Sequence, residues 1–262
     1  MSPGDEPMHA NHATDASRPS SAARGLVRVP VELSDVDRKG VYVVVAAYQE
    51  VATVGAVVRE LREVFPNVVV VDDGSHDATA ESARAAGARV LRHALNRGQG
   101  AALQTGIAYA LGRGAQIVVT FDADGQHQVA DLPYLVEPIV RGSAEVVLGS
   151  RFIGEGRKDV PPLRRALLRC AVLFTWLASG LRLSDAHNGL RAFSRSAALQ
   201  LDIQLDRMAH ASELIDQVKR SGLPLTEVPV RIRYTDYSRA KGQRSSDALR
   251  VAADYLIGRL LQ

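Results

Sequence analysis

The sequence is poor in cysteine, since Cys170 is the only one among 262 residues. A single cysteine excludes an internal disulfide and the paired thiolates of a structural zinc site, so we expect a reducing compartment. Cys170 lies in an apolar run, and we expect it to pack as a small buried hydrophobic residue.

Long hydrophobic runs are also missing. A membrane-spanning helix needs about 20 apolar residues. The longest apolar run, 170–181, is shorter and contains Thr175, Ser179 and Gly180. The first residues lack the charged-then-apolar order of a secretory signal peptide. We therefore expect a cytoplasmic protein that is soluble or peripheral on the inner face of the cell membrane.

A strong excess of charge of one sign is absent as well. The formal net charge is +3 and the isoelectric point is about 9.2. This mildly basic balance is compatible with nucleotides, phosphorylated lipids or an anionic membrane surface, and it is too weak to indicate nucleic acid. Hydrophobic residues make up 46% of the chain, which is ordinary for a globular protein with one large domain or two small ones.

From Gly40 onward, β-branched runs alternate with stretches of helical spacing. Before that point, residues 1–39 are rich in Ser, Pro, Ala, Asp and His, which is typical of a disordered tail. The predicted strands are 41–47, 68–71, 90–91, 116–120 and 146–148, and the predicted helices are 53–65, 78–86, 100–111 and 131–140. This alternation predicts an α/β fold with a mostly parallel sheet covered by helices on both faces.

After Arg151 the alternation breaks. The spacing predicts an apolar helix, a turn with a short strand, a second helix, an edge strand and a final amphipathic helix, at 163–181, 185–194, 210–221, 225–234 and 246–261. Several arginines stand at the start of the apolar helix, where positive charge opposes the helix dipole. An anionic partner and a solvated charged face explain them equally well.

Polar residues follow each of the first five predicted strands. They are Tyr48, Gln49 and Glu50; Asp72, Asp73, Gly74, Ser75 and Asp77; Asn96, Arg97 and Gly98; Asp122 and Asp124; and Ser150 and Arg151. In open α/β sheets, ligands bind outside the carboxyl ends of the strands. The pattern therefore predicts a binding site at this edge of the sheet.

The segment FDADGQH, which follows the fourth predicted strand, carries two carboxylates two residues apart. If the chain stays extended, Asp122 and Asp124 leave the same face and repel each other unless a cation lies between them. Oxygen ligands of this kind suit Mg²⁺ or Mn²⁺. Gln126 could add a neutral oxygen ligand, and His127 could orient the group. A solvated turn after a strand is an equally open interpretation of this motif taken alone.

Seven segments together resemble the family 2 glycosyltransferases with a GT-A fold. They are VVVAAYQE, VVVDDGSHDAT, NRGQGAAL, VTFDADGQH, VVLGSRF, HNGLRAFSR and TEVPVRIRY, in this order. The sequence is most similar to the branch that contains the polyprenyl-phosphate (dolichyl-phosphate) mannosyl and glucosyl synthases. This resemblance implies a single GT-A domain over 40–262, with a nucleotide-sugar-binding half at 40–150 and an acceptor half at 151–262.

The resemblance also implies roles, position by position. The donor would be bound by Tyr48, Glu50, Asp73, Asn96, Arg97, Asp122, Asp124 and Lys241, and the acceptor by Arg151, Arg164 and Arg165. A divalent metal, Mg²⁺ or Mn²⁺, would be held by Asp122, Asp124 and Gln126, and the catalytic residues would be Asp124, Arg151 and Glu213. Three positions depart from the family pattern: Ala46, Gln49 and the segment 238–241. These departures leave the base preference and the closing loop open.

The reaction implied is inverting transfer of a hexose from a nucleotide sugar of the GDP-mannose or UDP-glucose type to a polyprenyl phosphate. A sugar hydroxyl needs a carboxylate base, whereas an alkyl phosphate with a second pKa of about 6 is already largely dianionic at neutral pH. At the base position the chain has Glu213 without the Glu-Asp pair of hydroxyl-directed relatives. Transfer to a sugar hydroxyl in cell-surface polysaccharide synthesis and a non-catalytic nucleotide-sugar-binding protein are the alternatives. No nucleic acid partner is expected.

Overall fold

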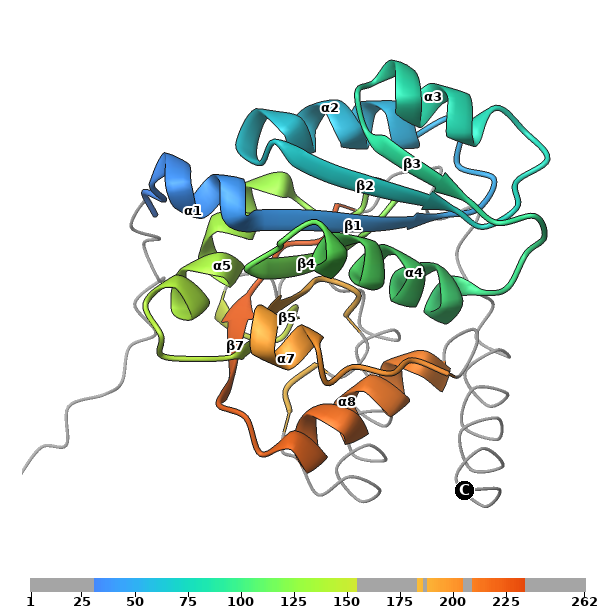
Figure 1. The fold of residues 1–262 in the computed structure, drawn as a ribbon. Helices are drawn as coiled ribbons and strands as arrows, with labels where there is room; N and C mark the ends of the chain where they lie inside the picture. The colour runs from blue at the N-terminus through green and yellow to red at the C-terminus, as the bar shows by residue number, and fades with distance from the viewer. Residues whose placement is uncertain (1–30, 155–182, 186–187, 205–208, 234–262) are drawn as a thin grey trace, which may run out of the picture.

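One mixed sheet organises the molecule. The computed structural model describes residues 31–154, 183–185, 188–204 and 209–233, and within these ranges seven strands pair in the order β3-β2-β1-β4-β6-β5-β7 (Figure 1). The strands are β1 Val41–Ala47, β2 Asn67–Asp72, β3 Arg89–Arg92, β4 Ile117–Asp122, β5 Val146–Ser150, β6 Arg191–Ser194 and β7 Leu225–Pro229. Neighbouring strands are parallel, except that β6 runs antiparallel to both β4 and β5.

Helices cover both faces of this sheet. They are α1 Asp35–Gly40, α2 Val54–Val64, α3 Thr79–Ala85, α4 Gln99–Gly112, the 3-10 turn η1 Val129–Asp131, α5 Leu132–Val140, α7 Arg195–Ala198 and α8 Ala209–Ser221. Buried residues of α2, α3 and α5 share one core with the sheet, and those of α4, α7 and α8 share the other. In Figure 1, α4 lies below β1, toward α7 and α8, whereas α2 and α3 lie above it.

The central strand shows why the sequence forms this sandwich. Successive side chains of a strand point to opposite faces, so Val43 and Val45 belong to one core and Val44 to the other. All three are fully buried. A strand buried on both faces needs a continuous β-branched run rather than an alternating one, and the first predicted strand has such a run.

The predicted α/β fold is confirmed, and each strand and helix expected before residue 150 is present. The antiparallel insertion of β6 between β4 and β5 is the one feature of the sheet that the strand pattern did not contain. The apolar helix expected at 163–181 and the final helix expected at 246–261 lie outside the described residues. Within the described ranges, no helix is long and apolar enough to cross a membrane.

Two expected boundaries need correction. Residues 35–39, which were expected to belong to the tail, are part of α1, which leads into the first strand. Ser34 caps this helix: its hydroxyl accepts from the backbone N–H of Asp37, and the Asp37 carboxylate accepts from the backbone N–H of Ser34. Leu33 is buried in the same core as α2. This reciprocal capping box is visible in the sequence as Ser-Asp-Val-Asp.

The strand expected over 225–234 is also shorter, because β7 ends at Pro229. Proline has no N–H to donate to a ladder, so it stands at the end of this edge strand. Beyond it, the chain pairs with a different partner through an isolated antiparallel bridge between Ile232 and His127. The segment after β7 is therefore placed against the turn that follows β4.

We expect Gly106 of α4 to be required for close packing of this helix on the sheet. A Cβ atom added there would overlap Val44 Cγ1 and lie 3.2 Å from Val71 Cγ2. Overpacking of a core costs about 1–3 kcal/mol, so Gly106→Ala should lower the free energy of unfolding by that amount, measured by urea denaturation.

Gly112, at the end of the same helix, is the matched control because no atom lies within 4 Å of an added Cβ. Gly112→Ala should leave the free energy of unfolding unchanged or raise it by up to about 1 kcal/mol, as expected from helix propensity. Equal free energies of unfolding for Gly106→Ala and Gly112→Ala would contradict this account of the packing.

Candidate active site

A cavity of about 390 Å³ opens at the carboxyl ends of β1, β2 and β4. The chain continues from β1 to β2 on one side of β1, while β4 pairs with its other side, so the strand order reverses at this point. Such a switch point is where open α/β sheets bind ligands. The lining residues are Ala46, Ala47, Tyr48, Glu50, Asp73, Asn96, Gly98, Gln99, Ala102, Asp122, Ala123 and Asp124. Residues that follow β1, β2, β3 and β4 thus converge on one cavity, whereas Ser150 and Arg151, at the end of β5, do not line it.

Asp124 lies in a turn rather than in an extended chain. β4 ends at Asp122, and the turn that follows has a positive φ of 74° at Gly125. The Asp124 carboxylate accepts from the backbone N–H of Gln126 at 2.9 Å and from its side-chain Nε2 at 2.7 Å. Burial, and then the nearby charge of Asp122, raise the pKa of Asp124. The two carboxylates are therefore close enough to repel each other, although the strand does not continue through both of them.

Three separate segments hold the Asp122 carboxylate. Gln99 Nε2 at the start of α4 donates to Oδ1 at 3.0 Å, and His127 Nε2 hydrogen-bonds Oδ2 at 2.9 Å. The backbone of Gly189 packs directly on the carboxylate, because a Cβ there would overlap Oδ2 and lie 2.8 Å from Oδ1. Burial opposes ionisation of Asp122, but the hydrogen bond and charge of His127, with His210 and Arg191 nearby, lower its pKa.

Arg191 is a functional candidate that the sequence analysis did not select. It stands in β6, it is buried, and its Nε donates to the carbonyl oxygen of Asn188 at 3.0 Å. Burial lowers the pKa of Arg191 to about 10, and the charges of Asp122 and Asp185 act in the opposite direction. The guanidinium stays protonated at neutral pH and compensates part of the negative charge behind the cavity. An arginine inside the short apolar segment Leu-Arg-Ala-Phe was the signal in the sequence that could have identified it.

Arg151, at the end of β5, forms a buried two-point ion pair. Its Nε and Nη2 donate to the two oxygens of Asp185 at 2.6 and 2.7 Å, and its backbone N–H donates to Asp185 Oδ2 at 3.1 Å. Glu227 of β7 in turn accepts from the backbone N–H of Asp185 at 3.1 Å. Asp185 therefore anchors its loop to β5. The contact of Arg151 with an acceptor phosphate stays a prediction.

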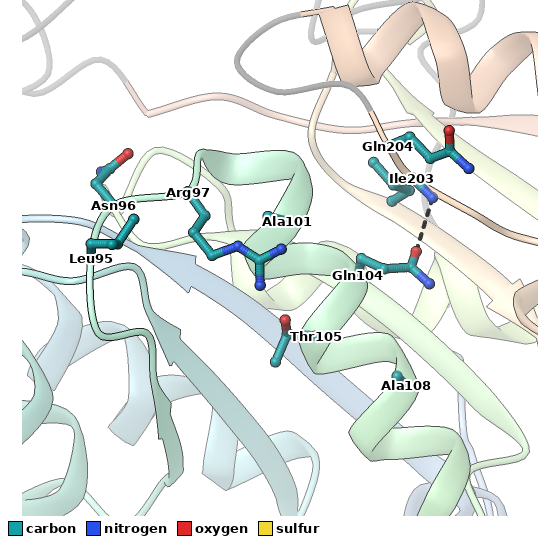
Figure 2. Close-up of a pocket in the computed structure, with 9 residues that line it drawn as sticks. All are labelled: Leu95, Asn96, Arg97, Ala101, Gln104, Thr105, Ala108, Ile203 and Gln204. Carbon is teal, nitrogen blue, oxygen red and sulfur yellow. Dashed lines mark hydrogen bonds between the residues drawn. The ribbon is translucent and has the colours of Figure 1, made fainter.

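The expected donor residues divide between this cavity and a neighbouring one. Tyr48, Glu50, Asp73 and Asn96 line the cavity that contains the aspartates. Arg97 does not line it. The Arg97 side chain lines a second cavity of about 770 Å³, where it extends from its loop toward α4 (Figure 2). The wall of that cavity also includes residues 203–204, and the backbone N–H of Ile203 donates to Gln104 Oε1 at 3.0 Å.

Glu213 lies apart from the aspartate cavity. Its buried carboxylate accepts from the backbone N–H of Gln204 at 3.1 and 3.2 Å, and it lines a different cavity with Gln217. The α8 residue whose charge acts on Asp122 is His210, one turn earlier. Glu213 thus fastens the segment before α8, and its predicted catalytic role is not supported by a place in the aspartate cavity.

Three expected site residues, Arg164, Arg165 and Lys241, lie outside the described residues. The last residues described before Lys241 contact the turn that follows β4. The backbone N–H of Arg233 donates to the carbonyl oxygen of Gln126 at 2.8 Å, alongside the bridge between Ile232 and His127.

The oxygen donors of the cavity have the chemistry of a magnesium or manganese site that shares its metal with a ligand. Across the described part of the chain, no group of three or more His, Cys, Asp or Glu side chains could hold a metal ion. Asp122 and Asp124 supply two carboxylates, one with a lowered and one with a raised pKa. Mg²⁺ is usually bound by one or two carboxylates together with substrate phosphates and water. The residues present therefore fit this kind of metal.

Solved structures with the same fold indicate the class of protein. The chain is similar to the crystal structure of glucosyl-3-phosphoglycerate synthase from Mycobacterium tuberculosis, with a TM-score of 0.64 and 22% identity over 82% of this chain and 77% of the other. Other structures of that enzyme contain Mn²⁺ and UDP-glucose. The likeness establishes a GT-A type of fold, which agrees with the expectation from the sequence.

The sequence comparisons then identify the family. The model of "Glycosyl transferase family 2" matches residues 42–201, more than half of the chain. The chain is 34% identical to a UDP-N-acetylglucosamine–dolichyl-phosphate N-acetylglucosaminyltransferase from Methanococcus voltae over 78% of its length and 90% of the relative. It is 31% identical to an undecaprenyl-phosphate mannosyltransferase from Micrococcus luteus over 72% and 82%. The protein belongs to glycosyl transferase family 2 and is a glycosyltransferase.

We expect the ion pair between Arg151 and Asp185 to be a major support of the loop before β6. Removing one partner of a buried pair leaves an uncompensated charge and costs about 3–5 kcal/mol. Asp185→Asn should therefore lower the free energy of unfolding by about this amount, measured by chemical denaturation.

The double variant Arg151→Met with Asp185→Leu should lose less free energy of unfolding than Arg151→Met and Asp185→Leu lose in sum when made singly. The reason is that no lone charge remains buried in the double variant. Glu137→Gln is the control: it weakens the partly exposed pair of Glu137 with Arg141 and should cost less than about 1 kcal/mol. Additive effects at 151 and 185 would contradict the coupling.

Proposed function

We propose that the protein transfers a hexose from a nucleotide sugar of the GDP-mannose or UDP-glucose type to a polyprenyl phosphate, with inversion and with Mg²⁺ or Mn²⁺. The observation that carries the proposal is the pair of carboxylates, Asp122 and Asp124, at the switch point of the sheet. Both are held by hydrogen bonds from neighbouring side chains, so they are oriented before a ligand arrives. Preorganised groups lose less free energy on binding.

The metal would be held by Asp122 and Asp124, with Gln126 contributing through its Oε1 atom. When bound, a divalent ion acts as a Lewis acid that stabilises the negative charge of the departing nucleoside diphosphate. The chain itself supplies the orientation of the ligands. Gln99, His127 and the bare backbone of Gly189 fix Asp122, and the Gln126 amide fixes Asp124. Tyr48 and Glu50 line the part of the cavity that would receive the nucleotide.

The acceptor is proposed from two observations. The carboxylate of Glu213 is bound to the backbone of Gln204 and lines another cavity, which argues against a general base at this position. A phosphate acceptor needs no such base, because it is already largely dianionic at neutral pH. The two relatives named above carry dolichyl phosphate and undecaprenyl phosphate in their names, which supports the same choice. A lipid acceptor would bring the protein to the inner face of the membrane.

We expect label from GDP-mannose or UDP-glucose to enter the organic phase when Mn²⁺ and a polyprenyl phosphate are supplied. The transfer should stop with EDTA and fall at least about 100-fold in Asp122→Asn and Asp124→Asn, because one preorganised electrostatic contact is worth about 10²–10³ in rate. Label that enters only water-soluble glycan would exclude the lipid acceptor. No transfer to any acceptor, together with no nucleotide binding, would exclude the proposed function.

Gly189→Ala provides a test of the metal ligands that does not depend on turnover. The added methyl group would displace the Asp122 carboxylate, and we expect Mn²⁺ binding to weaken about 10- to 100-fold, as for lost outer-shell contacts. Free Mn²⁺ is measured by electron paramagnetic resonance, with and without UDP and GDP.

Gly112→Ala, which meets no neighbouring atom, is the control and should bind Mn²⁺ like the unchanged protein. Circular dichroism should be the same for both variants. Unchanged Mn²⁺ affinity in Gly189→Ala would show that Asp122 does not hold the metal from its present position.

A further inference from the structure

The loop of residues 95–98 is the wall between the two cavities. Asn96 lines both of them, Gly98 lines only the cavity with the aspartates, and Arg97 lines only the cavity drawn in Figure 2. A shift of this short loop would therefore change the shape of the proposed nucleotide site from one side. What holds the loop decides how well that site is formed before a ligand binds.

The Asp73 side chain holds this loop by hydrogen bonds to the loop's backbone. The carboxylate accepts from the N–H of Arg97 at 2.9 Å and from the N–H of Gly98 at 2.8 Å, with one oxygen for each. Gly74, which has a positive φ of 73°, packs against the other end of the loop, where an added Cβ would lie 2.6 Å from the carbonyl carbon of Leu95. Asp73 is almost completely buried. Much of its hydrogen-bonding capacity is used inside the protein.

His93 connects Asp73 to α4. Its Nδ1 lies 2.7 Å from Asp73 Oδ1, and its Nε2 lies 3.0 Å from Thr105 Oγ1. An ionised carboxylate only accepts, so Nδ1 carries the proton toward Asp73, and in the neutral ring Nε2 then accepts from the threonine hydroxyl. The His93 and Asp73 side chains are 9% and 3% exposed, so water competes little for these contacts.

We propose that His93 is a positioning residue of the donor site, which acts by orienting Asp73 so that the loop of residues 95–98 keeps its place. The proposal rests on the proposed function, because it assigns the nucleotide to the cavity that this loop borders. Asp73 also lines this cavity itself, so His93 orients both a lining side chain and the loop beside it. Neither His93 nor Thr105 lines the cavity with the aspartates. Their effect on the donor is therefore indirect.

The expected consequence is a change in binding rather than in the chemical step. Asp122 and Asp124 belong to β4 and its turn, and their hydrogen bonds do not involve His93. Loss of His93 should let the loop move, and the donor would have to order it on binding, which lowers affinity. We expect His93→Ala to raise the KM for the nucleotide sugar and the Kd for UDP or GDP about 10-fold, with kcat within about 2-fold of the unchanged protein.

Two conservative variants separate positioning from simple packing. The amide nitrogen of an asparagine can take the place of Nδ1, and that of a glutamine can take the place of Nε2. His93→Asn should keep the contact with Asp73 and retain most of the nucleotide affinity, whereas His93→Gln should bind as weakly as His93→Ala. Thr105→Val removes only the hydroxyl that contacts Nε2, and its nucleotide affinity should lie between those of His93→Asn and His93→Gln. His76→Ala changes an exposed histidine of a nearby loop and is the control.

The experiment is isothermal titration of UDP and GDP in the presence of Mn²⁺, followed by measurement of KM and kcat for the sugar nucleotide. A higher nucleotide affinity in His93→Asn than in His93→Gln, with kcat retained in both, supports the proposal. Equal nucleotide affinities in all His93 variants, or equal losses of affinity in His93→Asn and His93→Gln, overturn the role of His93. If the unchanged protein still binds nucleotide, the proposed function stands. Absence of nucleotide binding by the unchanged protein overturns both.

Discussion

The structure depends on holding two like charges next to each other at the end of a buried strand. Asp122 and Asp124 repel, and burial adds to the cost of ionising them, as the raised pKa of Asp124 reflects. The chain accepts this cost because each carboxylate has fixed donors, Gln99 and His127 for one and Gln126 for the other. Under the proposed function, a bound divalent cation would offset this repulsion.

The second half of the chain completes the site through the sheet. β6 inserts antiparallel between β4 and β5, and the loop before it brings Gly189 against the Asp122 carboxylate. Arg191 then places a buried positive charge behind Asp122. The same loop is fastened to β5 by Arg151 and Asp185. The expected donor and acceptor halves are therefore parts of one sheet, so a change in the loop before β6 reaches the aspartates directly.

Sequence patterns predicted the residues that belong to one strand and its following turn. Asp73, Asp122 and Asp124 were selected because they follow apolar runs, and the structure places all three in one cavity. The patterns carry no signal for a side chain that binds a segment distant in the sequence. No pattern selected His93, which connects Asp73 with α4. Glu213 stood at an expected position for catalysis, which stays a prediction, and in the structure its carboxylate accepts a hydrogen bond from the backbone N–H of Gln204 before α8.

The sequence by itself determined the order of strands and helices, the burial of β1 on both faces and the carboxylates after β4, because backbone periodicity and burial are local properties. Only the tertiary structure decided which loops meet. Gly189 lies on Asp122, Arg97 lines the second cavity, and Asp73 binds the loop of residues 95–98. These contacts follow from packing and hydrogen-bond satisfaction between segments far apart in the chain. No spacing along the sequence encodes such contacts.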